Sequence, residues 1–131
     1  MDEGKELVRR YYAEVLNGRN LDAVENYFTD ERLIAGIRKG CFGYFQSFPD
    51  LHCSIEELVV EGDTVFCRSV ITGTQDGEYK GIAPTGRNVA AEAAEIYRVA
   101  DGKFVGYWCL TDVAGLTRQI TEERAAVPAT A

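Results

Sequence analysis

A single carboxylate ends the last apolar run of the sequence, and a tryptophan precedes it by four residues. In an extended chain Trp108, Leu110 and Asp112 share one face, because the side chains of a strand alternate between its two faces. If that face is buried, Asp112 is an acid in apolar surroundings. Such a carboxyl group is either paired or has a raised pKa, and a raised pKa suits proton transfer to and from a ligand. The alternative is a helix N-cap, a position that favours Asp.

Other polar side chains are candidates for contact with a ligand. Glu95 and Tyr97 share one strand face, on which Ala91 and Ala93 leave space. They would supply a second carboxylate and a hydroxyl donor to a ligand oxygen, unless Glu95 points to solvent. Gln75 lies in a polar turn, where it either hydrogen-bonds a ligand carbonyl or is simply solvated.

Three aromatic residues complete the candidate ligand-binding set. Trp108 would form a pocket wall that shields Asp112 from water and stacks on a flat ligand. Tyr12 and Phe45 lie in helical stretches and are candidates for the lining of the pocket. For all three residues the alternative is an aromatic position in the core. His52 is the only histidine, and we interpret it as structural or exposed.

Charge and composition exclude several function classes. The chain has 131 residues and a formal net charge of −7, which argues against binding to nucleic acid or to an anionic membrane. No apolar run approaches the roughly 20 residues of a membrane span, and the first residues are too acidic for a signal peptide. We therefore expect a cytoplasmic protein.

The cysteines do not indicate a metal site. Cys41, Cys53, Cys67 and Cys109 form no C-x-x-C pair, and one histidine is too few for the usual zinc ligand sets. We interpret the four thiols as reduced, small buried hydrophobic side chains. No metal and no cofactor are expected.

Hydrophobic periodicity predicts the elements that must position these residues. Helices are predicted over residues 6–17, 21–28 with Asn20 as N-cap, and from residue 31 or 37 to 48, with a last short helix over 113–120. Strands are predicted over residues 51–60, 64–74, 88–99 and 103–111. The stretch 90–95 has a helix-like composition, but its place between a glycine turn and a strand-like stretch favours a strand.

Three helices followed by an antiparallel meander predict an α+β domain over residues 1–120, with residues 121–131 as a disordered tail. The helices are expected to pack on one face of a curved sheet. Curved sheets closed by helices form cone-shaped cavities, and such cavities bind ligands.

A set of short segments, in this order, resembles the SnoaL-like polyketide cyclases of the nuclear-transport-factor-2-like superfamily. The segments are Phe48-Pro49-Asp50-Leu51, Ile55-Glu56-Glu57-Leu58-Val59, Glu61-Gly62-Asp63, Gly73-Thr74, Gly81-Ile82-Ala83-Pro84-Thr85-Gly86-Arg87, Ile96-Tyr97-Arg98-Val99 with Asp101-Gly102-Lys103, and Trp108 and Asp112 with Gly115-Leu116 and Gln119. The resemblance covers residues 5–120 and implies a cone-shaped α+β fold.

The resemblance also implies a function. It implies a cofactor-independent cyclase of secondary metabolism, such as antibiotic biosynthesis, that closes a ring in a carbonyl-rich polyketide by an intramolecular aldol-type reaction, with Asp112 as general acid and base. It further implies a homodimer that pairs through the outer face of the sheet. The sequence departs from the family at Gln75, where His is frequent, and at Gly106 and Tyr107, where Glu-His is frequent. The segment 29–36 is also shorter than in the family.

These departures leave two alternatives to a cyclase. One is a related tailoring enzyme, such as an isomerase or a hydroxylase-associated protein. The other is a non-catalytic module that binds a small molecule in the same pocket.

Overall fold

The computed structural model describes residues 3–122. The helical elements are α1 (Glu3–Tyr11), the π-helical turn η1 (Tyr12–Leu16), the 3₁₀ helix η2 (Leu21–Asn26), α2 (Glu31–Ser47) and α3 (Val113–Thr121). The strands are β1 (His52–Glu61), β2 (Thr64–Thr74), β3 (Asn88–Ala100) and β4 (Lys103–Thr111). The predicted α+β class is confirmed, and the predicted tail lies outside the described residues from residue 123 on.

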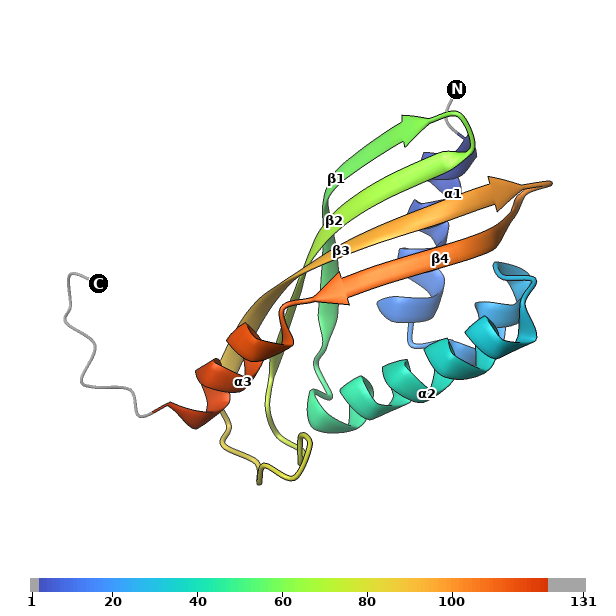
Figure 1. The fold of residues 1–131 in the computed structure, drawn as a ribbon. Coiled ribbons are helices and arrows are strands. Elements are labelled where there is room, and N and C mark those ends of the chain that lie inside the picture. The colour runs from blue at the N-terminus through green and yellow to red at the C-terminus, as the bar shows by residue number, and fades with distance from the viewer. Residues whose placement is uncertain (1–2, 123–131) are drawn as a thin grey trace.

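The four strands form one antiparallel sheet in which neighbours in sequence are neighbours in space, in the order β1-β2-β3-β4. Figure 1 shows the sheet as a curved layer, with α2 across its open side and α3 at the end of β4. Gln119 of α3 holds β3 through hydrogen bonds of 2.8 Å to both the N–H and the C=O of Ala90. Among the described helices, none is long and apolar enough to cross a membrane.

An aromatic cluster joins the first helix to the sheet. Tyr11 is buried and meets the ring of Phe28 at 5.4 Å and that of Phe104 at 5.8 Å, in both cases edge to face. Tyr97 of β3 lies 4.5 Å from Phe104, across the hairpin between β3 and β4. Edge-to-face and tilted arrangements of this kind add about 0.5–1.5 kcal/mol per pair beyond the burial of the rings. The cluster therefore fixes α1 against the strands that carry the inner polar residues.

Helix α2 begins at the earlier of the two predicted starts. Asp30 is its N-cap, and the Asp30 carboxylate accepts hydrogen bonds from the backbone N–H of Arg32 (2.8 Å) and Leu33 (3.2 Å). Most of the segment 29–36 thus forms the first turns of a helix. The capping role predicted for Asn20 is wrong, because its side chain makes no cap hydrogen bond and η2 is a 3₁₀ helix.

The side chain of Gln75 holds together the loop between β2 and β3. It is fully buried, and its Nε2 lies within 3.2 Å of the carbonyl oxygens of Gly77, Ile82 and Ala83. Its Oε1 accepts from the backbone N–H (3.1 Å) and the hydroxyl (2.7 Å) of Thr85. All of these partners lie in the loop, so the solvated position considered for Gln75 is wrong.

We expect Gln75→Leu to lower the free energy of unfolding by about 3 kcal/mol, because it removes the five hydrogen bonds that the buried amide makes within the loop. Urea denaturation measures this change. Gln46→Leu is the matched control, since Gln46 is exposed on α2 and its replacement should change the free energy by about 0.5 kcal/mol or less. Equal midpoints for the two variants would contradict the structural role of Gln75.

Candidate active site

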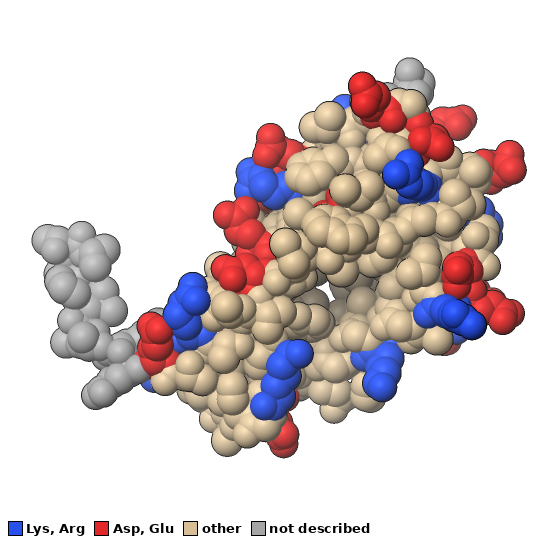
Figure 2. All heavy atoms as spheres, in the orientation of Figure 1, with Lys and Arg blue, Asp and Glu red and all other residues tan. Residues whose placement is uncertain are grey.

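A cavity of about 370 Å³ lies between α2 and the concave face of the sheet. Figure 2 shows the opening as a hollow in this face of the molecule. One face of α2 lines the cavity at helical spacing, through Leu33, Gly36, Ile37, Gly40, Cys41 and Tyr44. Gly36 and Gly40 widen it, because a Cβ at either position would meet nothing within 4 Å. The sheet supplies most of the other lining side chains.

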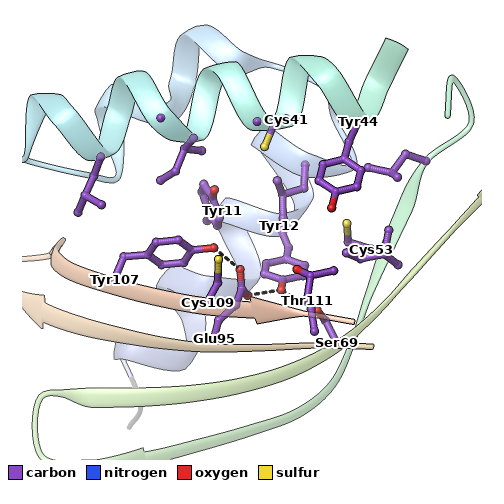
Figure 3. A pocket seen from close by; sticks show the side chains of 18 of the residues that line it. Tyr11, Tyr12, Cys41, Tyr44, Cys53, Ser69, Glu95, Tyr107, Cys109 and Thr111 are labelled. Atoms are coloured by element: carbon purple, nitrogen blue, oxygen red, sulfur yellow. Dashed lines mark hydrogen bonds between the residues drawn. The ribbon is translucent and has the colours of Figure 1, made fainter. Parts of the chain in front are cut away.

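The sheet side of the cavity carries one buried carboxylate. Glu95 is only 7% exposed, and the hydroxyls of three tyrosines converge on it. Figure 3 shows two of them, Tyr12 and Tyr107. Oε1 of Glu95 accepts from Tyr12 and, at 2.8 Å, from Tyr97. Its Oε2 accepts from Tyr107 at 2.7 Å. Since a carboxylate oxygen accepts two hydrogen bonds, Oε1 is saturated by these side chains and Oε2 retains one acceptor position.

Strand alternation and hairpin register bring these groups together. Ala93, Glu95 and Tyr97 all point to the inner face of β3, so the alternative that Glu95 points to solvent is wrong. Tyr107 of β4 is the register partner of Tyr97, which places both hydroxyls beside the same carboxylate. Period-two alternation identified Glu95 and Tyr97 as neighbours on one face, but their cross-strand partner Tyr107 was missed.

Tyr12 reaches the carboxylate from the helical side. It is the first residue of η1, where the N–H of Asn17 donates to the C=O of Tyr12 at 2.8 Å across a π-helical turn. Its hydroxyl also lies 3.0 Å from Oγ of Ser69 on β2. Single π-turns are frequent at functional sites, because they re-aim one side chain without ending the helix. Tyr12 lines the cavity, and its contact with a ligand stays a prediction.

Burial keeps the three tyrosine hydroxyls protonated. Desolvation, followed by the nearby charge of Glu95, raises the pKa of Tyr12, Tyr97 and Tyr107 well above the usual value for tyrosine. All three therefore act as hydrogen-bond donors at neutral pH. Hydrogen bonds to a charged group contribute about 1.5–3 kcal/mol each, so three of them offset the several kcal/mol that burial of a carboxylate costs.

The thiols of Cys41 and Cys53 are protonated as well. Cys109 also lines the cavity but is exposed, so the burial predicted for it is wrong. Burial raises the pKa of Cys41 and of Cys53, both in the cavity lining, to about 12. Thiols in this state are weak nucleophiles and weak metal ligands. Within residues 3–122, no group of three or more His, Cys, Asp or Glu side chains is arranged to hold a metal ion.

The prediction that Trp108 and Leu110 lie on the inner face of β4 is wrong. Trp108 is 50% exposed and Leu110 is 64% exposed, on the side of the sheet away from the cavity. Their neighbours Tyr107, Cys109 and Thr111 line the cavity instead. Both faces of β4 carry large apolar side chains, so alternation alone could not identify the inner one. Trp108 therefore does not form the predicted pocket wall.

Asp112 is exposed and occupies the N-cap of α3, the position weighed against burial from the sequence. Its carboxylate accepts a hydrogen bond of 2.9 Å from the backbone N–H of Gly115. It does not line the cavity, although Thr111, immediately before it, does. The burial expected for Asp112 is thus wrong, and its role in catalysis stays a prediction.

The remaining candidates lie outside the cavity lining. Phe45 is half-buried on α2, where the guanidinium of Arg19 lies 4.9 Å from its ring centroid. Gln75 is held within its own loop. In contrast, Arg32 in the first turn of α2 lines the cavity, and nothing in the apolar periodicity of the helix had indicated a binding role for it.

We expect Gly40→Leu to fill the cavity and to abolish the binding of an apolar fluorescent dye such as 8-anilinonaphthalene-1-sulfonate. Gly43→Leu is the matched control, because Gly43 lies on the same helix, meets nothing within 4 Å and does not line the cavity. Both substitutions remove a helix-interior glycine and should raise stability by up to about 1 kcal/mol. Dye titration and thermal unfolding of both variants measure the two effects. Equal dye binding by the two variants would contradict the assignment of the cavity.

Comparison with known proteins agrees with the family suggested by the sequence motifs. The family model described as SnoaL-like polyketide cyclase matches residues 6–120. No curated protein matches the sequence. Among solved structures, AclR from Streptomyces galilaeus, provisionally assigned as a hydroxylase, is 26% identical; the match covers 99% of this chain and 87% of AclR, with a TM-score of 0.84.

Two further structures show the same fold. TsrD from Streptomyces laurentii is 25% identical over 91% of this chain and 95% of its own, with a TM-score of 0.79. A provisionally assigned polyketide cyclase from Bacillus cereus is 26% identical over 87% of this chain and 77% of its own, with a TM-score of 0.71. On the match of the family model over nearly the whole chain, this protein belongs to the SnoaL-like polyketide cyclase family.

Proposed function

We propose that the protein is a cofactor-independent cyclase that closes a ring in a small, carbonyl-rich polyketide held in the cavity. The observation that carries the proposal is the carboxylate of Glu95, which is 7% exposed, lines the cavity and retains one acceptor position on Oε2. A buried carboxylate with a free lone pair in an apolar cavity is suited to remove a proton from carbon.

In the proposed reaction, Glu95 takes a proton from a carbon that lies between two carbonyl groups of the substrate. The resulting enolate carbon attacks a second carbonyl carbon of the same molecule, and a carbon–carbon bond forms as the carbon–oxygen π bond breaks. Glu95 then returns the proton to the new alkoxide, so the reaction needs no oxidant and no metal to balance. The cavity contributes by holding the substrate in a folded conformer, which lowers the entropic part of the barrier.

The tyrosines have two roles in this proposal. While Glu95 is charged, the hydroxyls of Tyr12, Tyr97 and Tyr107 stabilise the carboxylate. Once Glu95 holds the proton, it needs fewer donors. The hydroxyl of Tyr107, which lines the cavity, is then free to donate to the enolate oxygen.

Asp112 is the competing candidate for the general base, on the strength of the family resemblance. Its carboxylate is exposed and is engaged in capping α3. The position of Glu95 in the cavity supports Glu95 over Asp112, and the two residues give different expectations for mutants.

We expect Glu95→Gln to lower turnover by about 10²–10⁴-fold, because it removes the proton acceptor and keeps an oxygen for the tyrosine donors. Asp112→Asn is the matched carboxylate-to-amide control and should leave turnover and stability nearly unchanged, since Asn is an equally good N-cap. The assay follows linear polyketide intermediates by chromatography and intact mass. The reverse pattern, with Asp112→Asn inactive and Glu95→Gln active, would assign the base to Asp112.

A second candidate function is that of a hydroxylase-associated protein, which would hold the same class of substrate while a separate enzyme oxidises it with O₂ and a reductant. The similarity to AclR, provisionally assigned as a hydroxylase, favours it over an isomerase and over a module that only binds its ligand. With that enzyme present, the mass of the product separates hydroxylation from cyclisation, because an aldol closure leaves the mass unchanged whereas hydroxylation adds one oxygen atom. A protein that binds the intermediates and promotes neither reaction would be a non-catalytic binding module.

The outer face of the sheet supports the proposal of a homodimer. Val59, Phe66, Ile96 and Trp108 are successive register partners across the four strands and form an apolar row. Val59 is 56% exposed and Trp108 is 50% exposed. A row of this kind on an exposed sheet face is typical of an association surface, and a twofold axis would pair it with itself.

We expect light scattering to give twice the mass of one chain for the wild type and the mass of one chain for Trp108→Glu, because a charge in the apolar row opposes its burial. Phe42→Glu is the control, since Phe42 is 57% exposed but lies on α2, away from the row. A monomeric wild type at micromolar concentration would contradict the dimer.

A further inference from the structure

The cavity has opposite charges on its two sides. Among the described residues that line it, Arg32 is the single cation and Glu95 is the single carboxylate. Arg32 comes from the first turn of α2 and is exposed, whereas Glu95 is buried on β3. Figure 3 shows α2 and the strand that carries Glu95 on opposite sides of the pocket. A ligand that fills the cavity therefore meets a cation on the helix side and an anion on the sheet side.

The charge of Arg32 has no structural role in the fold. Its guanidinium makes no hydrogen bond or ion pair with any residue between 3 and 122. The Asp30 cap binds the backbone N–H of Arg32 and not its side chain. A cation in the first turn of a helix is also disfavoured by the helix dipole. Arg38, six residues further on, differs in both respects, because it binds the backbone of Leu21 and the carboxylate of Glu25.

We infer that the substrate carries a carboxylate, which binds the guanidinium of Arg32 while the reacting carbonyls face Glu95. The inference rests on the proposed function of the same cavity. A guanidinium matches a carboxylate through two parallel hydrogen bonds. The buried charge of Glu95 repels a second anion at the sheet side. The two side chains together thus select an acid over its neutral ester and fix the direction in which it enters.

The size of the effect follows from the exposure of Arg32. An exposed ion pair is weak, so the preference for the acid should be about fivefold, and salt should reduce it. The preference is therefore best measured at low ionic strength, with a pair of compounds that differ in one charge and little else.

Anthraquinone-2-carboxylic acid and its methyl ester form such a pair, since both are flat, stable and rich in carbonyl groups. Calorimetric titration at low ionic strength is expected to show that the wild type binds the acid about fivefold more tightly than the ester. Arg32→Gln should weaken binding of the acid by about fivefold and change that of the ester by about twofold or less. Lys39→Gln is the control for loss of one positive charge, because Lys39 lies on α2 outside the cavity lining, and it should change neither affinity.

Equal affinity of the wild type for acid and ester would overturn the inference, as would an equal loss of both in Arg32→Gln or binding of neither compound. An unchanged melting temperature of Arg32→Gln excludes a folding defect as the cause of weaker binding. The proposed function fails on a different measurement, the turnover of Glu95→Gln. A preference for the acid with unchanged turnover of Glu95→Gln would support Arg32 as the carboxylate-binding residue and refute Glu95 as the general base. Equal affinity for acid and ester with a loss of turnover in Glu95→Gln would refute the role of Arg32 and support that of Glu95.

Discussion

Burial of the Glu95 carboxylate is the constraint on which the rest of the structure depends. No ion pair with a residue in the described range balances its charge, so the fold has to supply donors from several elements. Tyr12 comes from the helical layer, Tyr97 from the same strand and Tyr107 from the neighbouring strand. The hydrogen bonds therefore tie the π-helical turn η1 to the sheet beside the cavity.

The same tyrosine side chain takes part both in the aromatic cluster and in the hydrogen bonds to Glu95. The ring of Tyr97 packs against Phe104, while its hydroxyl binds Glu95. A tyrosine serves both purposes because its body is apolar and its tip is a donor. Packing thus restricts where the hydroxyls can point, which pre-organises the site before any ligand enters.

Hydrophobic periodicity predicted the class and the order of the elements. Strand alternation placed Glu95 and Tyr97 on one face of β3, but it left open whether that face points to the cavity or to solvent. The face of β4 was assigned wrongly, because the outward Trp108 and Leu110 are more apolar than the inward Cys109 and Thr111. Counting back from the Asp101-Gly102 turn would have placed Gly106 opposite Tyr97. A register shift between Arg98 and Val99 brings Tyr107 there instead, so Tyr107 could not have been found by counting. The place of Arg32 in the cavity lining could not have been predicted from the sequence either. The sequence pattern around an exposed arginine on a helix is the same whether its charge contacts a ligand or only solvent.

The π-helical turn has a consequence for how this chain can vary in length. A π-turn holds one more residue than an α-helical turn, and each residue advances an α-helix by about 100°. Removal of a single residue between Tyr12 and Leu16 would restore α-helical spacing and rotate the two ends of the segment against each other by that angle. Tyr11 before the turn, and Tyr12, Val15 and Leu16 within it, are all buried. The extra residue therefore lets one continuous helical segment place Tyr11 in the aromatic cluster, Tyr12 at Glu95, and Val15 and Leu16 in the core.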